Sequence, residues 1–295
     1  MNSYYRIADH IININNNGNE LSILSLLPSF VPFKCDRSLN ENVLFTLTID
    51  EAVSLIDSDR VHRIRTFDTG NGDTVVDRLD DGGYQFVIKN IKGEDCVLLI
   101  TNKDFSDCKC SLYGTSNMRR FGLNNALMLI MAFAGSSKDT VLVHASLVRH
   151  NNYGYAFIAK SGTGKSTQVS LWLKYIPNCD LMNDDNPVIR LLDGIPYIYG
   201  SPWSGKTPCY RNVKAPLGAI TRIDRAKINS VDRLSPVESF ASVLPSCSSM
   251  KWDKDIFNNI CNVVSRIIEK VSIYTLHCTP EKEAAEICNK TISKQ

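Results

Sequence analysis

The stretch AKSGTGKS at residues 159–166 is the sequence feature that most constrains the fold of this chain. It matches the phosphate-binding pattern G-x-x-x-x-G-K-[ST] except that Ala159 replaces the first glycine. Such a loop needs a strand before it and a helix after it, because backbone N–H groups at the helix N-terminus cradle the phosphates. YGYAFIA at 153–159 has the composition of a buried strand. The segment after the loop carries apolar residues at the spacing of an amphipathic helix: Val169, Trp172, Leu173 and Ile176.

The loop therefore predicts a site for ATP, or another nucleoside triphosphate, with Mg²⁺. Its glycines allow the chain to wrap closely around an anion. Lys165 is expected to reach the β- and γ-phosphates, and the hydroxyl of Ser166 to join the Mg²⁺ shell. The predicted nucleotide-binding residues are Ser161, Gly162, Thr163, Gly164, Lys165, Ser166 and Thr167.

A second stretch, GSPWSGKT at 200–207, matches the same pattern without exception. Its context is wrong for a nucleotide site, because Pro202 has no N–H to donate and Pro208 follows with no helical pattern behind it. We therefore expect only the first loop to bind nucleotide. Two roles stay open for the second. It is either a lid or acceptor loop, in which Lys206 with Arg211 nearby stabilises charge on the transferred phosphoryl group, or a packed glycine–proline connection.

Two adjacent carboxylates, Asp184 and Asp185, end an apolar run about twenty residues after the first loop. Open α/β sheets bind ligands outside the carboxyl ends of their strands, which favours a functional role over a simple turn. We predict that Ser166 and Asp184 hold Mg²⁺. Asp185 is the predicted general base that accepts a proton from an attacking hydroxyl, although the two aspartates could exchange these roles.

The pattern of predicted elements changes near residue 118. Residues 1–117 contain short runs of branched and aromatic residues separated by Gly- and Asn-rich turns, which predicts a β-rich (α+β) domain of antiparallel strands. Residues 118–295 alternate strand-like and helical patterns, which predicts an α/β domain. In this second part we expect helices near 117–137, 166–176, 235–245, 255–271 and 280–292, and strands at 140–150, 153–159, 179–192, 194–200, 217–224 and 272–278.

Charge and composition limit the kinds of partner and the cellular compartment that we expect for this chain. The formal net charge is +2, which gives no reason to expect a nucleic-acid or membrane partner. The start of the chain lacks the pattern of a secretory signal, and no apolar stretch has the length of a membrane span. The ten cysteines form no C-x-x-C pair and no zinc-like grouping. We expect a cytoplasmic protein with reduced thiols, and the sequence leaves open whether it forms a homo-oligomer.

Three ordered motifs carry a resemblance to a known family: HASLV at 144–148, SGTGKST at 161–167 and LMNDDNPVI at 181–189. They resemble the shared core of HPr serine kinase/phosphorylase and ATP-dependent phosphoenolpyruvate carboxykinase, over roughly residues 119–295. The chain looks most like the HPr-kinase-like proteins with a β-rich N-terminal domain, some of which phosphorylate ribosomally made peptides. In that group a GSPW-x-GK segment follows the paired aspartates, as it does here.

The resemblance implies a P-loop kinase domain of the HPr kinase/carboxykinase type. It places Asp184 and Asp185 at the family's acidic pair and His144 among the residues lining the active site. Without the resemblance, a lone histidine in an apolar strand is more often a core residue. The Glu-x-Arg-Gly stretch of true HPr kinases is missing, since the chain reads YIYGSPWSGKTPCYRN at that point, which argues against HPr itself as the target and against reverse phosphorolysis.

The predicted function is a kinase that transfers the γ-phosphoryl group of ATP to a hydroxyl. The expected acceptor is a serine of a peptide or small protein, with a small-molecule alcohol such as free serine as the second choice. The β-rich domain would then recognise that substrate. The alternative is a nucleotide-dependent binding or regulatory module without transfer activity.

Overall fold

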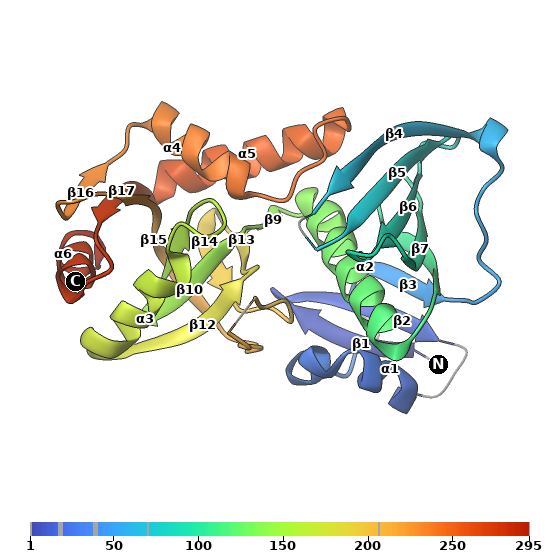
Figure 1. The fold of residues 1–295 in the computed structure, drawn as a ribbon, viewed down its shortest axis with the longest axis horizontal. Helices are drawn as coiled ribbons and strands as arrows, with labels where there is room; N and C mark the ends of the chain where they lie inside the picture. Colours follow the sequence, from blue (N-terminus) through green and yellow to red (C-terminus); the bar gives the residue numbers. More distant parts are fainter. Residues whose placement is uncertain (1, 17–19, 38–40, 70, 206, 295) are drawn as a thin grey trace. The chain divides into compact units, whose positions relative to one another are not determined.

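The computed structural model describes residues 2–16, 20–37, 41–69, 71–205 and 207–294. The chain forms two compact units, Met1–Gly135 and Ser136–Gln295 (Figure 1). Within the described ranges, none of the helices combines the length and the hydropathy that a membrane span requires.

The first unit is built on one eight-stranded sheet with the order β1-β2-β3-β8-β7-β6-β5-β4. The strands are β1 (Asn2–Ile7), β2 (His10–Asn16), β3 (Val43–Ile49), β4 (Val61–Asp68), β5 (Asp73–Leu79), β6 (Tyr84–Lys89), β7 (Asp95–Thr101) and β8 (Asp107–Leu112). The expectation of antiparallel strands throughout is wrong at two places, because β3 pairs in parallel with both β2 and β8. Parallel neighbours need a long crossover, and α1 (Glu20–Leu26) and a 3₁₀ helix (Pro28–Phe33) lie in the connection from β2 to β3.

The helix α2 (Ser116–Ser136) belongs almost entirely to the first unit, so the division along the chain comes after Gly135 and not between residues 117 and 118. Its contacts give the reason. The backbone of α2 approaches that of β7 so closely at Gly122 that a Cβ there would lie 2.9 Å from the carbonyl carbon of Cys96. Farther along α2, the ring of Phe133 packs edge-on against Phe105, with 5.4 Å between centroids.

The second unit contains a nine-stranded mixed sheet. Its main path has the order β12-β10-β11-β15-β14-β13-β9, and β17 pairs with β15 and β16. The strands are β9 (Thr140–Leu142), β10 (Ala145–His150), β11 (Tyr153–Ile158), β12 (Cys179–Asp185), β13 (Val188–Leu192), β14 (Ile195–Tyr199), β15 (Lys214–Arg225), β16 (Ser230–Arg233) and β17 (Ser272–Cys278). Only β11, β15 and β17 pair with one another in parallel among the described strands of this unit.

Two segments predicted as single strands are each divided in two. The segment 140–150 breaks at His144 into β9 and β10, and the segment 179–192 breaks after Asp185 into β12 and β13. The breaks match, because β10 pairs with β12 while β9 pairs with β13 on the far side of the sheet path. His144 lies between β9 and β10, and Asp185 is the residue at which β12 ends, so both lie where the two strand pairs separate.

Helices cover both faces of this sheet. The helices are α3 (Lys165–Tyr175), α4 (Pro236–Val243), α5 (Lys254–Lys270) and α6 (Lys282–Ile292). The core between α3, α6 and the sheet is centred on Trp172, which packs on Tyr155 and Phe157. Figure 1 shows α4 and α5 on the opposite side of the sheet from α3. Leu173 does not face the core as predicted, since 39% of the residue is exposed. The polar residue Gln168 is buried instead, with 2% of the residue exposed.

Strand register brings the predicted functional segments to one end of this sheet. Ala145, the first residue of β10, lies opposite both Ile158, the last residue of β11, and Asp185, the last residue of β12. The segments that continue from these positions are therefore neighbours: His144 before β10, the glycine loop after β11, and the acidic pair at the end of β12. This end of the sheet is the candidate site.

Candidate active site

The glycine loop joins β11 directly to α3, which is the strand–loop–helix context that the sequence predicts. Gly162 and Gly164 have φ angles of 76° and 134°, in the region that favours glycine, and Gly164 is the N-cap of α3. No side chain caps this helix. Its first N–H groups are consequently available to an anion, which the helix dipole also favours.

Arg225, the last residue of β15, holds the backbone of the glycine loop through two hydrogen bonds. Its Nε donates to the carbonyl oxygen of Thr163 at 3.0 Å, and its Nη2 donates to that of Gly162. These contacts hold the two carbonyl oxygens against the guanidinium group of Arg225. The N–H of Thr163 donates to the carbonyl oxygen of Lys160 at 3.2 Å, so the N–H groups offered to a ligand are those at the start of α3. Sequence reasoning missed Arg225, because it lies about sixty positions from the loop and its role follows only from the parallel pairing of β11 with β15.

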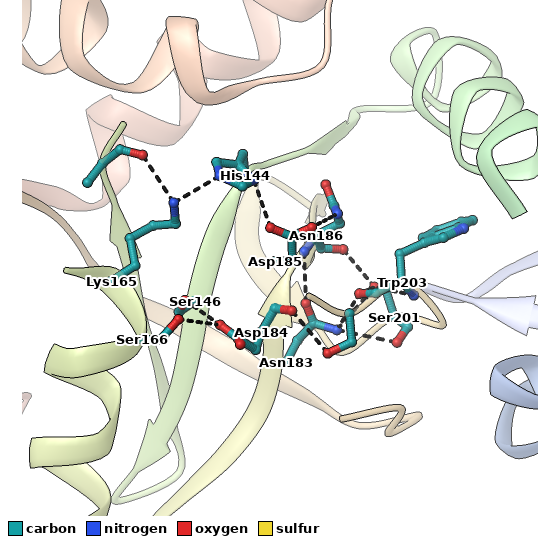
Figure 2. Close-up of polar contacts among 12 residues, drawn as sticks. His144, Ser146, Lys165, Ser166, Asn183, Asp184, Asp185, Asn186, Ser201 and Trp203 are labelled. Carbon is teal, nitrogen blue, oxygen red and sulfur yellow. Dashed lines mark hydrogen bonds and ion pairs between the residues drawn. The ribbon is translucent and has the colours of Figure 1, made fainter. Parts of the chain in front are cut away.

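The ammonium group of Lys165 is part of a polar chain that runs across the sheet end (Figure 2). Lys165 Nζ lies 2.8 Å from His144 Nε2 and donates to the carbonyl oxygen of Ala159 at 3.2 Å. The other ring nitrogen of His144, Nδ1, lies 3.0 Å from Asp185 Oδ1. Partial burial lowers the pKa of Lys165, while the charges of Asp185 and Asp184 oppose that shift.

Asp184 is buried, with 4% of the residue exposed, and its carboxylate collects hydroxyl and amide donors. Ser146 Oγ donates to Oδ1 at 2.6 Å, Ser166 Oγ donates to the same oxygen at 3.4 Å, and the backbone N–H of Thr207 donates to Oδ2 at 3.3 Å. The structure thus brings the two predicted metal ligands, Ser166 and Asp184, into contact. Both offer the hard oxygen atoms that Mg²⁺ prefers.

Asp185 is the more accessible of the two aspartates, with 34% of its side chain exposed beside a His144 side chain that is 43% exposed. His144 is therefore not a core residue of a strand. The φ angle of Asp185 is 130°, a conformation that costs a residue with a side chain about 1–3 kcal/mol and that clusters at functional sites. Asn186 Nδ2 donates to its second carboxylate oxygen at 2.8 Å.

The second loop lies against the acidic pair. Ser204 forms an isolated antiparallel β-bridge with Asp185. The carbonyl oxygen of Asp184 accepts from Ser204 Oγ at 3.0 Å and also from the N–H of Gly205. After Thr207 the chain continues to β15 and not into a helix, as the sequence indicates. The predicted Lys206 lies outside the described residues. Arg211 pairs with Asp180 at 2.6 Å.

Asn183 holds this loop in place, a role that the sequence does not reveal. Its residue is fully buried, and its Nδ2 lies within reach of the carbonyl oxygens of Ser201, Trp203 and Cys209, at 3.3, 3.0 and 3.4 Å. Its Oδ1 accepts from the N–H of Asn186 at 3.1 Å. One amide therefore ties the loop to the turn that carries Asp185 (Figure 2).

The remaining predicted residues lie along the first loop and the first turn of α3. Ser161 is exposed on the loop, Thr163 uses its carbonyl oxygen to bind Arg225, and Thr167 lines a cavity beside the helix. Of the predicted site, the structure brings together His144, Lys165, Ser166, Asp184 and Asp185. In the described parts of the chain, no three His, Cys, Asp or Glu side chains gather to hold a metal by themselves.

Comparisons with known proteins give little beyond this geometry. No protein-family model matches the chain, and no curated protein matches it. Among solved structures, the HPr(Ser) kinase/phosphatase from Coxiella burnetii aligns at 8% sequence identity and a TM-score of 0.31. The alignment covers 50% of this chain and 91% of that one. A likeness of this extent does not assign the chain to a family.

Proposed function

We propose that this protein is a Mg²⁺-dependent kinase that transfers the γ-phosphoryl group of ATP to a hydroxyl. One observation carries the proposal: the glycine loop, Lys165, Ser166 and both aspartates meet at one sheet end through hydrogen bonds. Phosphoryl transfer depends mainly on positioning and on charge stabilisation, and these groups supply both.

The residues present fit the nucleotide and the metal. The free N–H groups at the start of α3 and the ammonium group of Lys165 suit the phosphates of ATP. Ser166 and Asp184 would hold Mg²⁺, since Ser166 Oγ lies 3.4 Å from Asp184 Oδ1. Mg²⁺ is commonly bound by one or two protein oxygens together with phosphate oxygens. When bound, Mg²⁺ neutralises charge that develops on the phosphate oxygens.

Asp185 is the proposed general base. It accepts the proton of the acceptor hydroxyl while that oxygen bonds to the γ-phosphorus and the bond from the γ-phosphorus to the bridging oxygen breaks, releasing ADP. Asp184 is unsuited to this role because three donors already occupy its buried carboxylate. His144 lies between Asp185 and Lys165, so it orients the base and keeps the two opposite charges apart.

The proposed acceptor is a serine of a peptide or small protein, with a small-molecule alcohol such as free serine as the second candidate. The position of the 200–207 loop against Asp184 and Asp185 supports a lid or acceptor-side role for it. The β-rich first unit is the proposed recognition module. All ten cysteines are free thiols, which fits a reducing compartment such as the cytoplasm.

An assay of ADP formation separates this proposal from a regulatory module that binds nucleotide without transferring it. The purified full chain is incubated with Mg·ATP and either a pool of serine-containing peptides or free L-serine, and ADP is measured together with the mass of the acceptor. We expect ADP release that depends on the acceptor and on Mg²⁺, with one phosphate gained by the acceptor. Tight ATP binding with no transfer to any of these acceptors would favour the regulatory module.

A further inference from the structure

The segment GSPWSGKT at 200–207 brings hydroxyl groups of the chain itself to the aspartates. The proposed function uses the glycine loop and the acidic pair, and it leaves the second Gly-Lys-Thr sequence without a chemical role. The hydroxyl side chains of this segment are Ser201, Ser204 and Thr207, and a hydroxyl is the group that the proposed kinase phosphorylates. The segment is therefore a candidate substrate as well as a candidate lid.

The backbone of this segment is fixed against both aspartates. Ser204 forms a β-bridge with Asp185, and Gly205 passes so close that a Cβ there would lie 3.1 Å from Asp185 Cβ. The N–H of Thr207 donates to Asp184 Oδ2 at 3.3 Å. The segment therefore lies beside the proposed base and beside the proposed metal ligand of its own chain.

The three hydroxyls differ in how far they are engaged. Ser201 is fully buried, and its Oγ donates to the carbonyl oxygen of Asn186 at 2.6 Å. Ser204 Oγ contacts two carbonyl oxygens and one N–H, at 3.0, 2.6 and 3.2 Å. Thr207 is exposed, and within the described ranges of the chain its hydroxyl has no hydrogen-bond partner. Since an attacking oxygen must approach the phosphorus in line, Thr207 has the hydroxyl best suited to react.

Covalent geometry limits how far the Thr207 hydroxyl can lie from the site. Three bonds join Oγ1 to the backbone nitrogen of the same residue, a span of less than about 4 Å in any rotamer. Because that nitrogen lies 3.3 Å from Asp184 Oδ2, Thr207 Oγ1 lies within about 7 Å of the same oxygen. An acceptor that the chain itself holds this near has a high effective concentration.

We propose that the protein phosphorylates its own Thr207, within one chain, so that the second Gly-Lys-Thr sequence is a modification site. The inference rests on the proposed kinase function, because it uses the same ATP, metal ligands and base. Thr207 Oγ1 bonds to the γ-phosphorus while the bond from that phosphorus to the bridging oxygen breaks, which releases ADP. The proton of the hydroxyl passes to Asp185.

Mass spectrometry of the full chain tests this assignment. The purified protein is treated with a phosphatase, which is then removed, and is incubated with Mg·ATP without any added acceptor. We expect the chain to gain one phosphate, located on Thr207 by peptide mapping, with a rate constant that does not depend on protein concentration. Asp185→Asn should slow this self-modification roughly 10²- to 10⁴-fold, because it removes the base.

Two substitutions at Thr207 separate the hydroxyl from its surroundings. Thr207→Val keeps the shape of the side chain and the N–H that binds Asp184, and it should gain no phosphate. Thr207→Ser keeps a hydroxyl and should be modified at the same position. Thr291→Val, which removes an exposed threonine of α6, is the control and should be modified as the wild type is.

The assignment is overturned if the wild type gains no phosphate on Thr207, or if Thr207→Val gains as much phosphate as the wild type. A rate constant that rises in proportion to protein concentration overturns transfer within one chain. A wild type that stays unmodified yet phosphorylates an added acceptor overturns this inference alone. A wild type that modifies neither itself nor an added acceptor overturns the kinase proposal with it.

Discussion

Asp185→Asn is expected to slow phosphoryl transfer roughly 10²- to 10⁴-fold, the usual contribution of a general base. The Kd for Mg·ATP should change little, because the proposed metal and phosphate contacts lie on Asp184, Ser166 and Lys165. The amide is nearly the same size as the carboxylate, and asparagine carries the same branching as aspartate, so the substitution should add little strain at the φ angle of 130°. The fold should therefore survive, and the measurement is the single-turnover rate at saturating Mg·ATP.

Asp193→Asn is the control for this experiment. Asp193 also has a positive φ angle, 49°, and it is exposed in the turn between β13 and β14, away from the glycine loop. The control loses the same charge and should transfer at the wild-type rate. If Asp185→Asn keeps a rate within about threefold of wild type, Asp185 is not the base, and Asp184→Asn becomes the variant to compare.

The second large effect is expected on stability. Asn183→Ala should lower the free energy of unfolding by about 3 kcal/mol, because several buried backbone groups each lose a hydrogen bond to this side chain. The carbonyl oxygens of Ser201 and Trp203 and the N–H of Asn186 all lose their contacts with this side chain. Urea unfolding of the two proteins measures the difference.

A role in positioning predicts more than a loss of stability. At a temperature where Asn183→Ala is still folded, the transfer rate should fall while the Kd for Mg·ATP stays near that of wild type, because the loop beside Asp185 is released and the phosphate loop is not. Asn258→Ala, at an exposed position of α5, is the control and should alter neither stability nor rate. A free energy of unfolding within 1 kcal/mol of that of wild type, together with an unchanged transfer rate, would contradict the role assigned to Asn183.

Local features of the site are readable from the sequence because they depend on neighbouring residues. The strand, glycine loop and helix around Lys165 follow one another in the chain, and the helices α2, α5 and α6 lie within a few residues of their predicted ranges. The lack of a helix directly after residue 207 also follows locally, from Pro208 and the segment behind it.

Features that depend on strand pairing were not predictable in the same way. The division of two apolar runs at His144 and at Asp185 arises because each half pairs with a different neighbour in the sheet. The contacts of Arg225 with the glycine loop and of Asn183 with the 200–209 segment join positions far apart in sequence. Helical periodicity predicted Leu173 in the core because Leu173 is apolar, although it is exposed. The same pattern passes over Gln168, which is buried although it is polar.

The most direct test of the central claim is titration of Mg·ATP into wild type, Lys165→Ala and Lys206→Ala by calorimetry. We expect the wild type to bind Mg·ATP and Lys206→Ala to bind it nearly as well. Lys165→Ala should bind roughly 30- to 150-fold more weakly, because it loses a charged hydrogen-bond donor to the phosphates. If the wild type bound no ATP, or if Lys206→Ala alone destroyed binding, the glycine loop at 159–166 would not be the nucleotide site.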